Sequence, residues 1–239
     1  MLFLFNAIKA CGFLLISTWV APWFLVPFAI IDRKTNYWDV NYKFWLFTVL
    51  GTRFKYVNDT FILRRGFIIS NHRSWGDFFV DPLISSSTIV SRHTATLAVL
   101  PGAILAMLAN NLVSINRNKS RQELFQLITQ NMTNPILFYP EGTRKNYTIL
   151  NSVDETKEII KPGLLKSIYE YKKYPIQLQI SNNKENVFNE KKMKLNCNLV
   201  VTIFLSEPIY PMDYQTFEEF YNEICVKWYE QFNHVYQIK

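Results

Sequence analysis

The first residues that could do chemistry are a histidine and an aspartate in the segment NHRSWGD. His72 and Asp77 have the H-x4-D spacing of a histidine base whose imidazole ring is held and polarised by a carboxylate. A structural interpretation stands beside this one, because Ser74 and Asp77 are also spaced as a helix capping box. The two roles are compatible. The segment therefore predicts a catalytic pair, a helix start, or both.

The second candidate is the segment YPEGTR, which follows a short apolar run. Pro140 stiffens a turn, and Gly142 allows the backbone to approach a ligand closely. Arg144 can bind a phosphate through two parallel hydrogen bonds, and Thr143 adds a further donor. We expect Glu141 to orient Arg144 or to accept a hydrogen bond from a substrate hydroxyl. The alternative is an ordinary surface turn with an exposed Glu and Arg.

The charge balance favours an anionic partner. The chain has 26 Lys and Arg residues against 19 Asp and Glu, a net charge of +7, which suits phosphate, phospholipid headgroups or nucleic acid. Arg117 follows the apolar stretch Leu112–Ile115 and is either a second cation for such an anion or a solvated strand end. Because the basic residues are dispersed and no RNA-binding signature is present, we expect no nucleic-acid partner.

Composition excludes two further classes of protein. With 49% hydrophobic and 19% charged residues, the chain has enough apolar surface to fold, so it is not intrinsically disordered. Its three cysteines, Cys11, Cys197 and Cys225, are too few and too scattered for a disulfide framework or a CxxC metal site. We therefore expect a reducing compartment and no metal.

Strands that alternate with helices must position the candidate residues. Helical spacing covers residues 119–132 and 217–235, and Thr216 and Glu219 form a capping box before the second helix. The polar stretch 181–196 is expected to be an exposed loop or hairpin. Short apolar runs predict buried strands at Phe67–Ser70, Ile136–Tyr139, Tyr174–Ile180 and Leu199–Leu205. The pattern is that of an α/β domain.

The amino-terminal segment predicts a membrane anchor. Cys11–Ile31 is uncharged and, at about 1.5 Å per residue, long enough to cover a hydrocarbon core of roughly 30 Å. A cleaved signal peptide would have a shorter apolar region and a small-x-small cleavage site, which is missing before Asp32. Pro22 and Pro27 each remove a helix hydrogen bond, so the segment is a kinked span or two short helices in one leaflet.

A second uncharged stretch, Thr94–Ile115, also has the hydropathy of a membrane span. Pro101 and Gly102 interrupt it. A single span here would separate His72 and Glu141 by the membrane, so we expect this stretch to lie against the bilayer instead. More Lys and Arg residues follow the first apolar run than precede it, which places the bulk of the chain in the cytosol.

The motifs taken together resemble the glycerolipid acyltransferase family typified by 1-acylglycerol-3-phosphate acyltransferases. That family is marked by Asn-His-x4-Asp, an apolar block ending in arginine, Phe-Pro-Glu-Gly-Thr-Arg, and an apolar segment with a central proline. NHRSWGD matches the first block at His72 and Asp77, and VSINR places Arg117 at the family's arginine. YPEGTR matches the third block over residues 140–144, and YPIQ around Pro175 resembles the fourth.

The resemblance extends over about Phe67 to Ile209 and implies both fold and domain organisation. It implies an α/β fold of the glycerol-3-phosphate acyltransferase type, in which helices flank a mixed central sheet. An anchor at residues 1–31 would precede an acyltransferase domain at residues 32–239. Two departures, Tyr139 in place of Phe and Asn116 where an acid is common, bear on the identity of the acceptor.

The resemblance also implies a reaction. A fatty acyl group would pass from acyl-CoA, or from an acyl-carrier protein, to the free hydroxyl of a lysophospholipid. The first candidate acceptor is 1-acyl-sn-glycerol 3-phosphate, which gives phosphatidate. His72 and Asp77 would be catalytic, and no cofactor or metal would be needed beyond acyl-CoA as co-substrate. The residues that would hold the acceptor are Arg117, Glu141, Gly142, Thr143 and Arg144.

Two alternatives stay open at this stage. The acceptor could be lysophosphatidylcholine, lysocardiolipin or glycerol 3-phosphate, or the chain could be a non-catalytic lipid-binding membrane protein. The intact His72 and Asp77 favour the enzyme. The family implies an intracellular, endoplasmic-reticulum-like membrane with the catalytic domain in the cytosol. The sequence leaves the identity of any protein partner open.

Overall fold

The computed structural model describes residues 2–32, 35–98, 100–116, 118, 120–130 and 132–238. Its contacts group into two compact units. Unit 1 comprises residues 1–53, 74–118 and 183–200, and unit 2 comprises residues 54–73, 119–182 and 201–239.

Unit 2 is an α/β unit built on a mixed sheet with strand order β1-β9-β6-β2-β5. Strands β2, β5 and β6 are parallel, and β9 is antiparallel to β6. The predicted α/β class with a mixed sheet is confirmed, and the four predicted strands form close to their predicted bounds. The elements are β1 (Arg53–Tyr56), β2 (Phe67–Ser70), α7 (Arg121–Thr129), β5 (Ile136–Phe138), α8 (Val153–Ile159), α9 (Pro162–Tyr171), β6 (Ile176–Asn182), β9 (Val200–Leu205), the 3-10 turn η3 (Pro211–Asp213) and α11 (Phe217–Gln237).

The central strand β2 carries the first motif. Phe67, Ile68 and Ile69 are fully buried, as the unbroken apolar run predicts for a parallel strand covered on both faces. Phe67 lies opposite Ile136 of β5 and Ile176 of β6, so the three strands are in register. Because parallel strands end at the same edge of a sheet, the loops after β2 and β5 emerge together.

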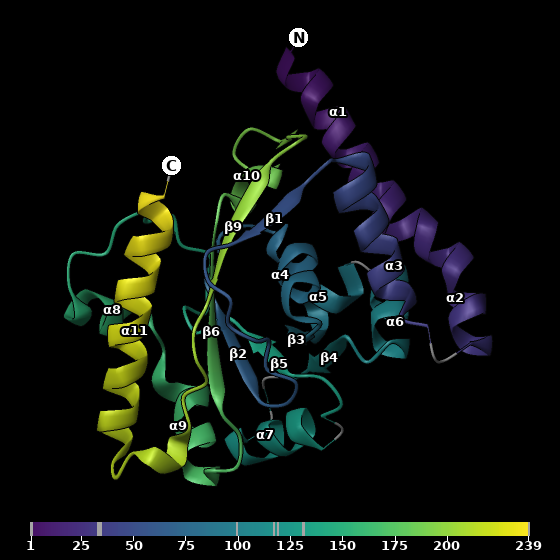
Figure 1. The fold of residues 1–239 in the computed structure, drawn as a ribbon. Helices are drawn as coiled ribbons and strands as arrows, with labels where there is room; N and C mark the ends of the chain where they lie inside the picture. The colour runs from purple at the N-terminus through teal and green to yellow at the C-terminus, as the bar shows by residue number, and fades with distance from the viewer. Residues whose placement is uncertain are drawn as a thin grey trace. The chain divides into compact units, whose positions relative to one another are not determined.

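The carboxyl-terminal helix α11 covers the sheet of unit 2 and packs against β6, α8 and α9 (Figure 1). The predicted capping box is present, with Thr216 accepting from the Glu219 N–H and the Glu219 side chain accepting from the Thr216 N–H. The helix buries one face at helical intervals, consisting of Phe220, Ile224, Cys225, Trp228, Phe232 and Val235. Burial of this apolar face is what holds the helix on the sheet.

Unit 1 combines helices with the parallel strand pair β3–β4. The described residues of the apolar stretch 94–115 divide between α5, α6 and β4, so they form no single spanning helix, as expected. The elements are α1 (Leu2–Leu14), the π-helical segment η1 (Leu15–Val20), α2 (Ala21–Ile31), α3 (Tyr37–Lys43), a second π-helical segment η2 (Phe44–Val49), α4 (Asp77–Ser85), β3 (Thr88–Arg92), α5 (His93–Ala98), α6 (Leu100–Leu108), β4 (Leu112–Ile115), α10 (Lys184–Val187), β7 (Phe188–Asn189) and β8 (Lys194–Leu195).

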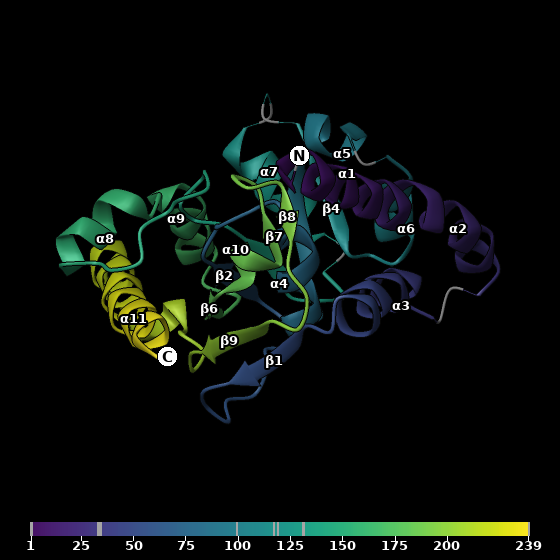
Figure 2. The ribbon, with the colours of Figure 1, turned by 90° about the horizontal axis from the view of Figure 1, so that it is seen from above.

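Helices α1 and α2 join through η1 into one apolar helix that α6 contacts within unit 1 (Figure 2). Asn6–Ile31 is the one helix of the described residues that is long and apolar enough to cross a membrane. Pro22 lies in the first turn of α2 and Pro27 lies inside it, and the helix continues through both. Apolar side chains on this helix are exposed, including Phe24 at 71% and Ile31 at 83%.

Candidate active site

His72 follows β2 and is held through its backbone. Its N–H donates a 2.5 Å hydrogen bond to Oε2 of Glu141, and its carbonyl accepts from the Lys145 N–H at 2.9 Å. The imidazole stacks on the Tyr139 ring, with centroids 4.2 Å apart and planes 16° apart. Unit 2 thus brings the histidine of NHRSWGD together with the PEGTR segment.

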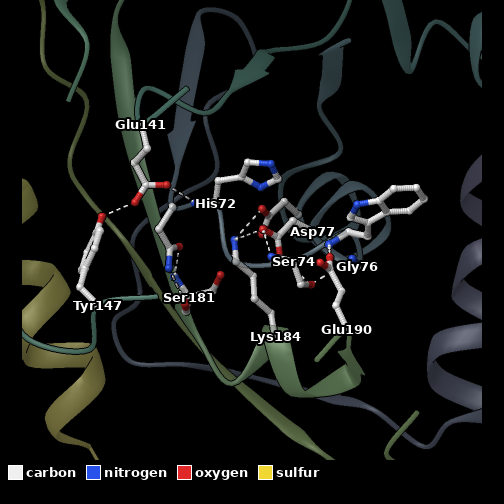
Figure 3. A network of polar contacts seen from close by, with 12 residues as sticks. His72, Ser74, Gly76, Asp77, Glu141, Tyr147, Ser181, Lys184 and Glu190 are labelled. Atoms are coloured by element: carbon white, nitrogen blue, oxygen red, sulfur yellow. Dashed lines mark hydrogen bonds and ion pairs between the residues drawn. The ribbon is translucent and has the colours of Figure 1, made fainter. Parts of the chain in front are cut away.

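Glu141 is a buried carboxylate with protein partners on both oxygens. Its side chain is 1% exposed, and Oε1 accepts a hydrogen bond from the Tyr147 hydroxyl (Figure 3). Burial, and then the charge of Glu141, raise the pKa of Tyr147 well above its ordinary value, which keeps this hydroxyl protonated as the donor. The carboxylate therefore fixes the backbone of His72.

Arg73 contacts Tyr147, the second hydrogen-bond partner of Glu141, within unit 2. The residue is 6% exposed, and its guanidinium donates to the Tyr147 carbonyl at 2.5 Å. It lies 5.7 Å from the centroid of the Tyr147 ring and 5.2 Å from that of Tyr236. Sequence reasoning missed Arg73 and Tyr147, although a cation directly after His72 was a signal that could have been weighed.

The remainder of the PEGTR segment forms an exposed turn. Gly142 donates its N–H to the Tyr139 carbonyl at 3.2 Å and has a φ of +74°, a left-handed conformation that favours glycine. Thr143 and Arg144 follow on the surface. The turn thus presents a hydroxyl and a guanidinium to solvent, while the neighbouring Glu141 reaches inward to the backbone of His72.

Asp77 belongs to unit 1, where it begins α4 and is fully buried. Its Oδ2 accepts from the Ser74 N–H at 2.9 Å, and its Oδ1 lies 3.3 Å from the Ser74 hydroxyl oxygen. That hydroxyl accepts from the Gly76 N–H at 3.0 Å. The predicted capping box is therefore only half present, because Asp77 accepts from the Ser74 N–H but the N-cap is Gly76, which makes no side-chain capping hydrogen bond.

Lys184 lies beside Asp77 in unit 1 (Figure 3) and forms an ion pair with Asp81. Lys184 places its Nζ 2.7 Å from Oδ2 of Asp81 and 4.0 Å from Oδ2 of Asp77. All three side chains are fully buried. The sequence placed Lys184 in an exposed polar stretch, and that expectation was wrong at this residue because the stretch folds inward as α10.

Not every predicted site residue lies in unit 2 with His72. His72 and Asp77 lie in different units and are five positions apart along the chain, so their pairing stays a prediction from the spacing. Arg117 lies outside the described residues. Among the residues that the structure describes, no three His, Cys, Asp or Glu side chains are grouped in a way that could hold a metal ion.

Comparison with known proteins identifies the family. The model of the Acyltransferase family matches residues 53–177, which is more than half of the chain. No curated protein matches in sequence. The crystal structure of PlsC from Thermotoga maritima, a 1-acyl-sn-glycerophosphate (LPA) acyltransferase, is similar with a TM-score of 0.69 and 14% identity, covering 99% of this chain and 98% of that one. The shared fold extends over both chains almost entirely, and the family match spans both motifs. The chain belongs to the acyltransferase family.

Proposed function

We propose that this protein transfers a fatty acyl group from acyl-CoA to the free hydroxyl of 1-acyl-sn-glycerol 3-phosphate, giving phosphatidate. The observation that carries the proposal is the hydrogen bond from the His72 N–H to Glu141, which joins a general base to the PEGTR turn. Membership of the acyltransferase family supports the reaction class. The likeness to an LPA acyltransferase supports the choice of acceptor.

In the proposed mechanism His72 is the general base. An alcohol is too weak an acid to attack a thioester unaided, so the neutral imidazole takes the hydroxyl proton as the oxygen attacks the thioester carbonyl, a contribution of roughly 10²–10⁴ in rate. The carbon–sulfur bond then breaks, and the proton passes from His72 to the departing thiolate. Asp77 holds the ring tautomer and stabilises the imidazolium. No acyl-enzyme forms, because neither a GxSxG motif nor a cysteine beside a motif is present in the sequence.

The exposed turn provides the proposed acceptor site. Arg144 binds the acceptor phosphate through a bidentate pair, with Thr143 as a further donor and Arg117 as a second cation. Holding the phosphate there orients the acceptor hydroxyl toward His72, so that an encounter in solution becomes an oriented reaction. Glu141 acts through the backbone of His72 and does not contact the acceptor. Its burial and its two protein partners support this role.

The proposed membrane attachment uses the helix Asn6–Ile31. Both lipid substrates partition into a bilayer, so an enzyme held there meets them at high local concentration. The exposed apolar side chains of this helix, among them Trp23 at 54% and Phe24 at 71%, support insertion into lipid.

The test is thiol release from acyl-CoA by the purified full chain in mixed micelles, with a panel of lysophospholipids and with glycerol 3-phosphate. We expect release that depends on lysophosphatidate and falls at least about a hundredfold in His72→Ala. His234→Ala is the matched control, because His234 is an exposed histidine of α11, and it should retain wild-type activity. If thiol release depends on a different acceptor, that acceptor replaces lysophosphatidate in the proposal. No release with any acceptor, from folded protein, would refute the proposal and favour lipid binding without catalysis.

A further inference from the structure

Lys184 is a fully buried lysine at the end of a central strand. Strand β6 ends at Asn182, Asn183 adopts a left-handed conformation with a φ of 72°, and Lys184 begins the short helix α10. This turn directs the ammonium group at α4, where its Nζ lies 2.7 Å from Asp81 and 4.0 Å from Asp77 (Figure 3). Lysine is rarely buried to this extent unless it is paired with a carboxylate.

The burial of these three charged groups costs free energy. Asp77 and Asp81 are four residues apart on α4, so they share a face, and two like charges at that spacing repel each other. Both carboxylates and the ammonium group give up water completely. Apolar residues of similar volume commonly stabilise such a site as well or better, so stability gives little reason for three charges here. A requirement on the charge of Asp77 does give one.

We infer that Lys184 is a positioning residue for the acyl transfer, which holds Asp77 as an oriented carboxylate and leaves its negative charge available to His72. The inference rests on the proposed function, because only there does Asp77 act on the histidine. Two features of the geometry carry it, namely the unequal distances from Lys184 to the two carboxylates and the separate hydrogen bonds to Asp77 from Ser74.

The unequal distances divide the roles of the two carboxylates. Asp81 takes the close ion pair with Lys184, and Asp77 instead accepts from the Ser74 N–H at 2.9 Å. The ammonium group at 4.0 Å favours ionised Asp77 through space without forming a close pair with it. Two carboxylates and one ammonium carry a net charge of −1, so the trio can stabilise one developing imidazolium. Asp81 thus keeps Lys184 from neutralising Asp77.

Other charged groups lie on the elements packed against α4 and α10 within unit 1. Asp39 and Lys43 on α3 pair with each other at 3.4 Å. Tyr42 stacks on Phe79 of α4, and burial raises its pKa above the ordinary value, so it stays neutral. Further charged groups on these elements and beside them include Arg92 at the end of β3, Glu185 on α10, and Glu190, Lys191 and Lys192 after β7. The Glu190 carboxylate accepts from the Trp75 N–H.

The test compares kcat and KM against pH for the full-length wild type, Lys184→Met, Asp81→Asn and the double variant Lys184→Met/Asp81→Asn. In Lys184→Met the two buried carboxylates lose their cation and share a proton, which raises the pKa of Asp77. Asp77 is neutral below that pKa, so kcat at neutral pH should fall. Each unit by which the pKa of Asp77 exceeds the assay pH lowers the ionised fraction tenfold, and we expect a fall in kcat of at least about tenfold. The rate should keep rising with pH where the wild-type rate is flat, and KM should stay within about twofold.

The other two variants give the inference a charge-dependent signature. Asp81→Asn frees Lys184 to pair closely with Asp77, so kcat should fall without the new pH dependence. The double variant removes the competing carboxylate as well and should regain part of the activity lost in Lys184→Met. If Lys184→Met does not fold, Asp81→Asn and the double variant decide the question. Wild-type kcat in Asp81→Asn, or losses in all variants with an unchanged pH profile, would overturn the inference.

A measurement independent of turnover separates this inference from the proposed function. The chain has few aspartates, so carbon-13 labelling of their carboxyl groups gives a simple spectrum in which the absence of a signal in Asp77→Asn assigns Asp77. The Asp77 signal should titrate at higher pH in Lys184→Met than in the wild type. Inactive wild type with this shift present would refute only the proposed function. The same titration in both proteins would refute the role of Lys184.

Discussion

Glu141 offers a direct test of how His72, the proposed base, is held, because two substitutions separate the shape of the Glu141 side chain from its charge. In Glu141→Ala the His72 N–H and the Tyr147 hydroxyl both lose their buried acceptor. Each orphaned donor costs about 1–3 kcal/mol, so the free energy of unfolding should fall by about 2–6 kcal/mol. A displacement of the base by about 1 Å is enough to lower kcat about a hundredfold.

Glu141→Gln should behave differently, because the amide can satisfy both donors. Its oxygen accepts from the His72 N–H, and its amino group donates to the Tyr147 hydroxyl, which can rotate to accept. The loss of charge weakens both hydrogen bonds, so we expect destabilisation within about 2 kcal/mol. The backbone of His72 stays in place, and kcat should remain within about tenfold of the wild type, a limit of about 1.4 kcal/mol in the activation barrier.

The assays are denaturant unfolding in micelles and steady-state kinetics with varied lysophosphatidate. Glu158→Gln, an exposed glutamate of α8, is the control for loss of a negative charge. A role in acceptor binding would instead raise the KM for lysophosphatidate in Glu141→Gln with kcat preserved. That result, or wild-type activity in Glu141→Ala, would refute the view that Glu141 works by holding the backbone of His72.

Two further predictions concern single side chains. Arg144→Ala should raise the KM for lysophosphatidate at least about tenfold, and Arg144→Lys should recover only part of this because the bidentate fork is lost; an unchanged KM in both would remove Arg144 from the acceptor site. Burial raises the pKa of the Cys225 thiol to about 11, against smaller lowering effects of Tyr221 and Lys157. Its thiolate fraction at pH 8 is about one in a thousand, so a thiol reagent should modify exposed Cys197 and spare Cys225 until the protein is unfolded, as peptide mass spectrometry would report.

The strands and the last helix could be predicted because their signals are local. Apolar runs of strand length gave β2, β5, β6 and β9, and the capping box with helical apolar spacing gave α11. Proximity of His72 and the PEGTR segment in unit 2 also followed, since both come after strands that proved to be parallel neighbours. What local signals cannot give is the partner of a side chain from a distant segment, and Glu141 binding the backbone of His72 is such a case.

Lys184 shows why a polar stretch can mislead. The residues around it are hydrophilic, and such composition usually indicates exposure. The lysine is buried because two aspartates, more than a hundred positions earlier in the chain, supply the opposite charge. Burial of a charged residue depends on its partners, which a window of neighbouring residues does not contain. The amino-terminal helix is the opposite case, because its length and apolarity could be predicted from its own residues without knowledge of any partner.

The backbone anchoring of His72 has a consequence for how this enzyme can change over generations. The hydrogen bonds that hold the loop use the N–H and carbonyl of residue 72, which every amino acid except proline can supply in full. Replacement of the histidine by any residue other than proline therefore removes the proposed base and leaves these two backbone hydrogen bonds available. Where one nucleotide change in the histidine codon causes the replacement, one reverse change restores the proposed base, so loss and recovery of the proposed acyl transfer can each take a single mutation.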